Sequence, residues 1–105
     1  MIDPKNLLQS TLTLEQIGPF EYKAQSFNPG WNRIYGGQII AQSMLASSKT
    51  VTDKNCHSIH SYFMRPGDPE KPVTFHVNPI RDGRSFATRT LEAFQGEEAI
   101  FTMSA

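Results

Sequence analysis

Two adjacent glycines, Gly36 and Gly37, open the part of the sequence best suited to chemistry. They lie at the start of the segment 35–51, which is mostly small and aliphatic and has Lys49 as its only charged side chain, so a helix without a charged face is expected. The first N–H groups of a helix lack partners within it and carry partial positive charge. Glycines leave these groups uncovered for an anion or a carbonyl oxygen. A structural role, in which the glycines let the helix enter tightly beneath a sheet, is the favoured alternative.

Polar side chains near this helix offer further candidates. Gln38 could orient a water molecule or bind a carbonyl group, and ordinary hydrogen bonding in the first turn explains it equally well. His57 and His60 are three residues apart, so on a strand they lie on opposite faces and do not share a metal ion. His60 shares a face with Tyr62 and could line a cleft, although a structural role is favoured. With one cysteine and no third ligand, the sequence predicts no metal site.

Three arginines lie near expected strand ends: Arg65, Arg81 and Arg84. A guanidinium group matches the geometry of phosphate, so these side chains could bind a phosphorylated ligand. Ion pairs are an equally good interpretation, and the available carboxylates are those of Asp68, Asp82 and Glu92. Cys56 adjoins His57, but neighbouring side chains on a strand point to opposite faces, so no cysteine nucleophile is expected.

The charge balance argues against several classes of protein. Lys plus Arg and Asp plus Glu number 10 each, unlike the basic excess of nucleic-acid or anionic-membrane binders. No basic segment followed by an apolar run is found at the N-terminus, so no signal peptide is expected. No apolar stretch approaches the ~18 residues of a membrane span. The single cysteine cannot form an internal disulfide, and we expect a reducing compartment, the cytoplasm.

Periodicity predicts two helices and five strands. They are a helix over 4–17, a strand over 20–27, the central helix over 35–51, and strands over 57–64, 72–80, 85–94 and 99–103. Thr11 and Thr13 weaken the first helix, so a break is expected near them. Val73, Phe75 and Val77 alternate as an inward face of their strand, which leaves His76 outward and exposed.

Turn residues connect these strands as hairpins. Residues 28–30, Asn-Pro-Gly, are typical of a turn, and Asp-Gly within 81–84 supplies the positive φ of a tight hairpin. Residues 95–97 predict a second tight turn. The apolar phase shifts between Phe86 and Leu91, which indicates a bulge. An antiparallel sheet curling around the central helix satisfies this pattern, and the end of the chain just after an apolar strand indicates a domain boundary.

Several segments of the chain resemble the N-terminal half of acyl-CoA thioesterase II, a double hotdog-fold enzyme. They are residues 6–8, 14–17, 35–38, 57–68, 80–86 and Gln95. The segment 57–68, His-Ser-Ile-His-Ser-Tyr-Phe-Met-Arg-Pro-Gly-Asp, is the most specific, and the resemblance covers nearly the whole chain. It implies an α+β hotdog fold, in which an antiparallel sheet wraps around a long central helix. Residues 1–105 would then be a single hotdog domain, without the second repeat.

The same resemblance implies hydrolysis of fatty acyl-CoA to free fatty acid and CoA, without a cofactor. The family's catalytic Asp, Ser or Thr, and Gln belong to the second repeat. Residues 37–38 offer no carboxylate, and Gln95, which resembles the catalytic Gln, lacks those partners. We therefore expect no catalytic residue here and little activity from this chain alone. Its expected contribution is half of the acyl-CoA cleft, with these substrate-binding residues: Gly36, Gly37, Gln38, His60, Tyr62, Arg65 and Arg81.

A second hotdog repeat is the expected partner of this domain, and another copy of the chain would cover the same apolar surface in a homo-oligomer. The alternative function is a non-catalytic module that binds acyl-CoA or mediates dimerisation. A dehydratase of the same fold is less favoured, because its catalytic histidine needs an acid and His60 has no evident acidic partner on its face. Nucleic acid, a membrane span and a metal ion form no part of this expectation.

Overall fold

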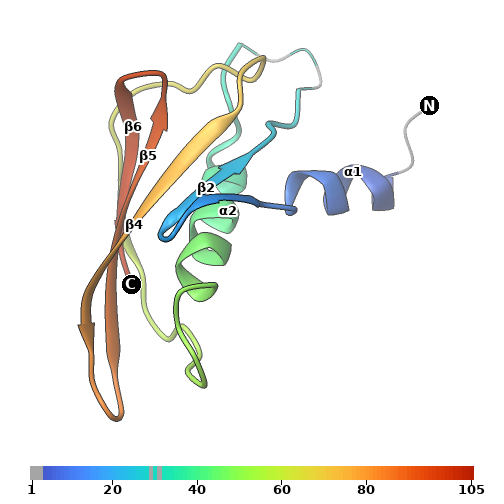
Figure 1. Ribbon diagram of the computed structural model, residues 1–105. Helices are drawn as coiled ribbons and strands as arrows, with labels where there is room; N and C mark the ends of the chain where they lie inside the picture. Colours follow the sequence, from blue (N-terminus) through green and yellow to red (C-terminus); the bar gives the residue numbers. More distant parts are fainter. Residues whose placement is uncertain (1–3, 29, 31) are drawn as a thin grey trace.

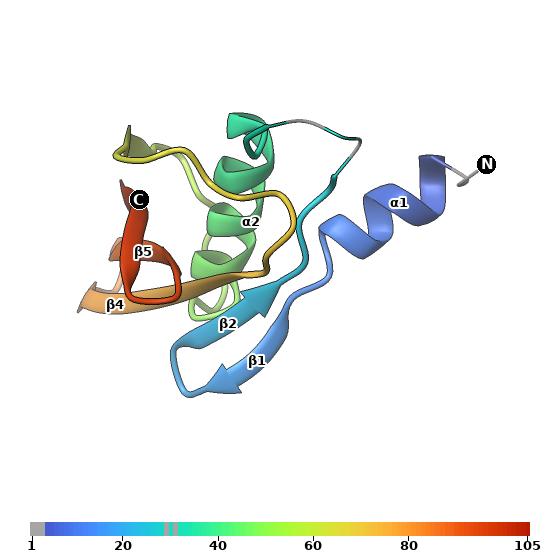
Figure 2. The same cartoon turned by 90° about the horizontal axis from the view of Figure 1, so that it is seen from above.

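The computed structural model describes residues 4–28, 30 and 32–105, in which a sheet packs against a helix (Figure 1). The elements, in chain order, are α1 (Pro4–Thr11), β1 (Glu15–Gly18), β2 (Glu21–Ala24), α2 (Gly36–Ser48), β3 (His60–Phe63), β4 (Val73–Asp82), β5 (Ala87–Gln95) and β6 (Glu98–Ser104). Figure 2 shows α2 lying along one face of the sheet, whereas α1 extends beyond the edge that β1 and β2 form. The core therefore lies between α2 and the sheet.

All neighbouring strands are antiparallel, in the spatial order β1-β2-β4-β5-β6-β3. The long strands β4, β5 and β6 form the middle of the sheet, and the short strands β1 and β3 form its edges. The sheet twists so that its inner face follows α2 (Figure 1). The expected α+β architecture, an antiparallel sheet wrapped around a central helix, is confirmed.

Small side chains let α2 lie close to the sheet. Ser43 and Ala46 are fully buried on the helix, and both have side chains of little bulk. The sheet meets them with large apolar side chains, because Phe75 and Phe101 are also fully buried. Strand alternation produces this face, and the predicted inward residues Val73, Phe75 and Val77 are confirmed as core.

The predicted helix over 4–17 is wrong in its second half. α1 ends at Thr11, and residues 15–18 form β1, in which Glu15 pairs with Lys23 of β2. Thr13 Oγ1 donates to the backbone carbonyl of Gln9, which satisfies a carbonyl that a continuing helix would use. The break near Thr11 and Thr13 is confirmed, but the chain continues as an edge strand after it.

Other boundaries differ from the prediction in instructive ways. β3 begins at His60, three residues later than expected, and the first predicted strand is reduced to β2. The bulge lies on β4, where Pro79 pairs with Arg89 and Arg81 pairs with Thr88, so Ile80 is the extra residue. The shift of apolar phase on β5 therefore reflects an irregularity of the opposing strand.

In the turn at 28–30, Gly30 has φ 97° and its N–H donates to Asn28 Oδ1. Pro29 and the neighbouring Trp31 lie outside the described residues.

Candidate functional site

The N-terminal end of α2 begins at Gly36, and no side chain caps it at Tyr35. The glycines allow aromatic rings to approach closely. A Cβ atom on Gly36 would lie 3.1 Å from Phe63 Cζ, and one on Gly37 would lie 2.4 Å from Tyr35 Cε2. These contacts support the structural explanation of the glycine pair. The N–H groups of Gly36 and Gly37 belong to the first turn of α2, where a helix offers them no acceptor of its own.

A pocket of about 360 Å³, which we call the mouth pocket, opens beside this helix end. It is lined by Arg33, Ile34, Gly36, Ile39, Phe63, Met64, Arg65, Pro66, Gly67, Ile100 and Phe101. Two predicted site residues, Gly36 and Arg65, therefore meet in one pocket. Arg65 Nη1 donates to the carbonyl of Ala99 at 2.6 Å, which anchors the guanidinium group to β6. None of the described residues that line the mouth pocket is acidic.

Gln38 takes part in a buried hydrogen-bond network rather than facing the mouth pocket. Its Oε1 accepts from the backbone N–H of Phe27 at 2.9 Å, and its Nε2 donates to Gln42 Oε1 at 3.3 Å. Gln42 Nε2 in turn donates to the carbonyls of Thr11 at 2.8 Å and Gln25 at 2.9 Å. Gln38 and Gln42 thus fasten α1 and the segment after β2 to α2. Both polar ends of the Gln38 amide are engaged, which favours the structural explanation.

His60 and Tyr62 lie on the edge strand β3, with ring centroids 5.7 Å apart. Phe63 points toward the helix, because its ring packs on Phe101 at 5.0 Å and lines the mouth pocket. Alternation along the strand therefore places His60 and Tyr62 on the opposite face of the sheet. The predicted site residues do not form one cluster. Gly36 and Arg65 share a pocket, and the pair on β3 lies on the other side.

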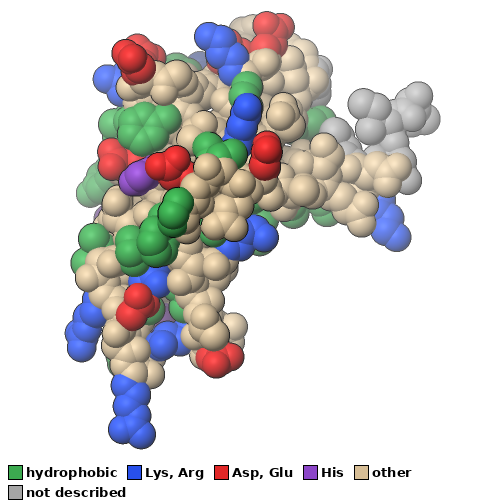
Figure 3. All heavy atoms as spheres, in the orientation of Figure 1, with side chains coloured by type: hydrophobic (Ala, Val, Ile, Leu, Met, Phe, Trp, Pro, Cys, Tyr) green, Lys and Arg blue, Asp and Glu red, His purple; other side chains and the backbone are tan. Residues whose placement is uncertain are grey.

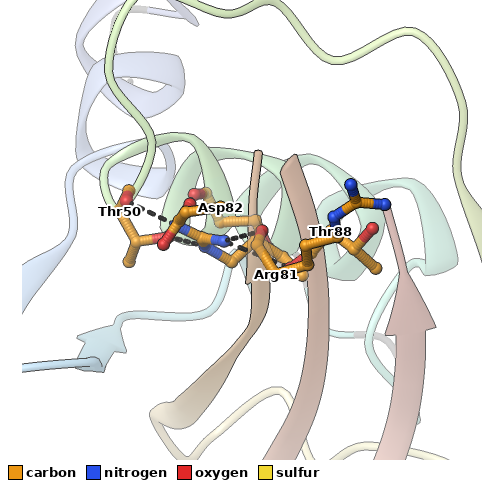
Figure 4. A network of polar contacts seen from close by, with 6 residues as sticks. Thr50, Arg81, Asp82 and Thr88 are labelled. Carbon is orange, nitrogen blue, oxygen red and sulfur yellow. Dashed lines mark hydrogen bonds and ion pairs between the residues drawn. The ribbon is translucent and has the colours of Figure 1, made fainter. Parts of the chain in front are cut away.

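A buried arginine, Arg89, was not predicted from the sequence. All five of its N–H donors are used. Nε donates to Thr50 Oγ1, Nη1 to the carbonyls of Arg81 and Thr88, and Nη2 to the carbonyl of Thr50 and to Asp82 Oδ1. Figure 4 shows how these contacts bring Thr50, after α2, against the hairpin formed by β4 and β5. We call this network the arginine clamp. One signal could have revealed it, since Arg89 continues the inward phase of Leu91 and Ala93.

The remaining predicted ion pairs take a different form from that expected. Asp82 pairs with Arg89 at 2.7 Å rather than with Arg81 or Arg84. Arg81 and Arg84 are exposed on the hairpin between β4 and β5, and Figure 3 shows a basic side chain (blue) at its tip. Such a tip could meet an anionic ligand, as the sequence suggested.

Gln95 and His76 also have partners in the structure. Gln95 bonds to both backbone groups of Asp68, at 2.7 Å from the amide nitrogen and 2.8 Å from the carbonyl oxygen. Gln95 therefore fixes the loop between β3 and β4. His76 is half-exposed and lies 3.3 Å from the carboxylate of Glu21, so it has a partner that the sequence did not suggest.

Comparison with known proteins identifies the family to which this chain belongs. Residues 23–105 match the family described as acyl-CoA thioesterase N-terminal domain. The tesB protein of Mycobacterium avium subsp. paratuberculosis superposes with a TM-score of 0.89 and 37% identity, covering 97% of this chain and 42% of that one. The chain is a hotdog-fold domain. It belongs to the acyl-CoA thioesterase N-terminal domain family.

Curated relatives agree with this assignment. Mouse acyl-coenzyme A thioesterase 8 is 42% identical over 101 residues, which cover 94% of this chain and 32% of that protein. Acyl-CoA thioesterase 2 of Haemophilus influenzae is 33% identical, covering 100% of this chain and 37% of its own length. The chain thus spans about a third of the length of these relatives.

The described residues contain neither a membrane-spanning helix nor a metal-binding cluster. Neither α1 nor α2 has the length and apolar character that crossing a membrane requires. Among the described residues, no group of three or more His, Cys, Asp or Glu side chains is arranged to hold a metal ion. The cytoplasmic location stays a prediction.

Proposed function

We propose that this chain is the N-terminal hotdog domain of an enzyme that hydrolyses fatty acyl-CoA to free fatty acid and CoA. Family membership and the names of its relatives support this activity. The reaction needs a hydrogen-bond donor for the thioester carbonyl and a base or polar group that activates water. The described residues of the mouth pocket supply possible donors but no carboxylate, so the base must come from elsewhere.

The open edge of the sheet at β3 is the observation that carries this proposal. β3 pairs with β6 on one side, and among the described strands none pairs with its other side. Its neighbourhood carries large exposed apolar side chains, those of Ile59, Tyr62, Phe63 and Met64. An unpaired strand with exposed apolar residues favours the addition of another strand. We propose that a second hotdog domain covers this edge and supplies the catalytic groups.

Substrate would then bind between the two domains. In this proposal the start of α2, at Gly36 and Gly37, faces the thioester, and Arg65 lies beside it in the mouth pocket. His60 and Tyr62 contact the substrate from the β3 edge. Gln38 holds the start of α2 in place, and Arg81 binds a phosphate of CoA. No residue of this chain acts as the base.

The test measures thiol release from palmitoyl-CoA by this chain alone and by the chain joined to a second hotdog domain, as in its longer relatives. We expect no significant hydrolysis by the chain alone and full hydrolysis by the two-domain protein. Hydrolysis by the isolated chain at the rate of the two-domain protein would overturn the division of roles.

A non-catalytic acyl-CoA-binding module is the second candidate. The lack of any acidic residue among the described residues of the mouth pocket favours it. Calorimetric titration with palmitoyl-CoA discriminates the two. Tight binding without thiol release, in the two-domain protein as well, would support the binding module and reject hydrolysis.

A further inference from the structure

The end of β6 leads toward a part of β5 that has no partner on one side. Arg89 of β5 and Ala105 exchange two backbone hydrogen bonds, of 2.9 Å and 2.8 Å, which continue the β5–β6 ladder. Past Arg89, no described residue pairs with β5 on this side. β5 itself extends to Ala87, which pairs with Asp82 on the β4 side. The first residues of β5 therefore have a strand on one side only.

A pocket of about 230 Å³, which we call the strand slot, lies beside these first residues of β5. Ala87 lines one wall of the slot, and residues 53–58 line another. The latter segment precedes β3, whose His60 lies opposite Ser104 near the end of β6. Among the described residues, no backbone hydrogen bond joins these two walls. Because Ala105 also lines the slot, β6 leads directly into it.

The register of the β5–β6 ladder shows which backbone groups face the slot. Both the N–H and the carbonyl of Arg89 bond to Ala105, so they point toward β6. In an antiparallel ladder such pairs recur at every second residue, so the N–H and carbonyl of Ala87 point toward the slot. An extended segment that continued β6 would therefore bond to Ala87 through the second residue after Ala105.

The same register sets the direction of side chains in the slot. Phe101 and Met103 of β6 are buried in the core between the sheet and α2. Alternation continues this phase to Ala105, which packs against the core, and then to the second residue after it. That residue would meet Met44 and Val51, both of which line the slot. Its surroundings are therefore suited to an apolar side chain.

Size, backbone chemistry and charge favour a peptide segment over a small ligand. The slot is smaller than the roughly 300–1,000 Å³ of typical small-molecule sites. A strand offers Ala87 both a donor and an acceptor, whereas a hydrocarbon chain offers neither. Asp53 and Lys54 line the slot with opposite charges, and Arg89 is paired with Asp82. A neutral strand with one apolar side chain therefore suits the slot.

We propose that the strand slot binds an extended segment of the two-domain protein, the one that follows Ala105, and that this segment lengthens β6. Its second residue is apolar and packs on Met44 and Val51. The inference rests on the proposed function, in which this domain is joined to a second hotdog domain. The greater length of the relatives, of which this chain spans about a third, agrees with it.

Filling the slot would also set where the connection to the second domain begins. The slot lies at the C-terminal end of α2, since Ser47 and Ser48 line it, whereas Gly36 at the other end lines the mouth pocket. The two ends of this 13-residue helix are ~18 Å apart. The connection would therefore stabilise the domain from a place away from the proposed thioester site.

The test compares this chain unextended, extended after Ala105 by Thr-Val-Thr, and extended by Val-Thr-Thr. The two extensions have the same composition, but only the first has valine at the second position, facing α2. We expect Thr-Val-Thr to raise the urea midpoint and to slow amide exchange of Ala87 about tenfold relative to Val-Thr-Thr, the effect of burying a valine side chain. NMR should show contacts of this valine with the methyl groups of Met44 and Val51.

Equal urea midpoints for the two extensions, or equal exchange at Ala87, would overturn the proposal. Decanoate tests a hydrocarbon ligand as the other occupant. We expect no amide shifts around Met44 when decanoate is added to the Thr-Val-Thr chain, because the slot is filled. Shifts there would mean that the slot stays open to a ligand, and they would also overturn the proposal.

The two-domain protein supplies a second measurement and separates this inference from the proposed function. Aspartate at the second position after Ala105 should lower its urea midpoint more than aspartate at the first position. If the protein shows this difference but does not hydrolyse palmitoyl-CoA, the thioesterase is rejected and the strand slot stands. If it hydrolyses palmitoyl-CoA without this difference, the thioesterase stands and the strand slot is rejected.

Discussion

Arg89 Nη2 donates a 2.7 Å hydrogen bond to Asp82 Oδ1 across the β4–β5 hairpin, although Arg81 is the immediate neighbour of Asp82. The Arg89 side chain is 4% exposed, whereas that of Asp82 is 64% exposed. The ion pair thus reaches from the protein interior to its surface. Because Arg89 also bonds to Thr50, one side chain joins the end of α2 to the hairpin.

Replacing Arg89 should destabilise the fold. Arg89→Met leaves the carbonyls of Thr50 and Arg81 without their partner, so we expect a loss of about 3 kcal/mol in the free energy of unfolding. Arg89→Lys should lose nearly as much, because one ammonium cannot reach all these acceptors. Urea unfolding measures both, with the exposed Arg84→Ala as a control that stays within about 0.5 kcal/mol. A lysine variant of unaltered stability would contradict the arginine clamp.

Gln42 should control how firmly α1 is attached. Gln42→Leu removes the donor to the Thr11 and Gln25 carbonyls and leaves Gln38 with one partner fewer, which should cost about 2 kcal/mol. Amide hydrogen exchange in α1 should accelerate more than exchange in β5. The exposed Gln16→Leu provides the comparison. Unchanged protection of α1 in Gln42→Leu would show that other contacts hold the helix.

The β3 edge should mediate self-association of this chain. Tyr62→Lys places a charge on the open edge, so sedimentation velocity should show less association at a given concentration. Phe86→Lys is a matched control, because Phe86 and Tyr62 are both 65% exposed and only Tyr62 lies on β3. Equal effects of the two substitutions would mean that general surface hydrophobicity, rather than the strand edge, drives association.

Two glycines beside the mouth pocket should respond to alanine in opposite directions. A Cβ on Gly67 would lie 2.6 Å from Ile34 Cδ1 in a buried region, so Gly67→Ala should destabilise by about 2 kcal/mol. On Gly37 the clash is with the ring of Tyr35, which is 62% exposed and can turn away. Alanine also favours the helix there, so Gly37→Ala should raise the midpoint of thermal unfolding. A gain in stability from Gly67→Ala would refute the tight packing described for this loop.

The sequence predicted the features that depend on local patterns. Alternation identified Val73, Phe75 and Val77 as core, and the lack of charge in 35–51 identified the central helix, which is α2. Residues 15–18 were missed because Leu14 and Ile17 also fit helical spacing. Only pairing with β2, a tertiary contact, makes this segment a strand.

The candidate site was harder to predict because its contacts join distant segments. Arg89 meets Thr50 from 39 residues away, and Gln42 meets Thr11 from 31 residues away. No local spacing encodes such pairs. The sequence also assigned Gly36 and His60 to one substrate cleft, although β3 places His60 on the face of the sheet opposite to that of Phe63 and the mouth pocket.

The close approach of α2 to the sheet, set by Ser43 and Ala46, links the packing of the interior to the width of the space beside Gly36. A larger residue at either position would lift the helix off the strands. That displacement would widen the space beside Gly36 at the same moment as it loosened the interior. Variation in the size of acceptable ligands should therefore arise from the loops at the two ends of the helix, while its buried flank stays small.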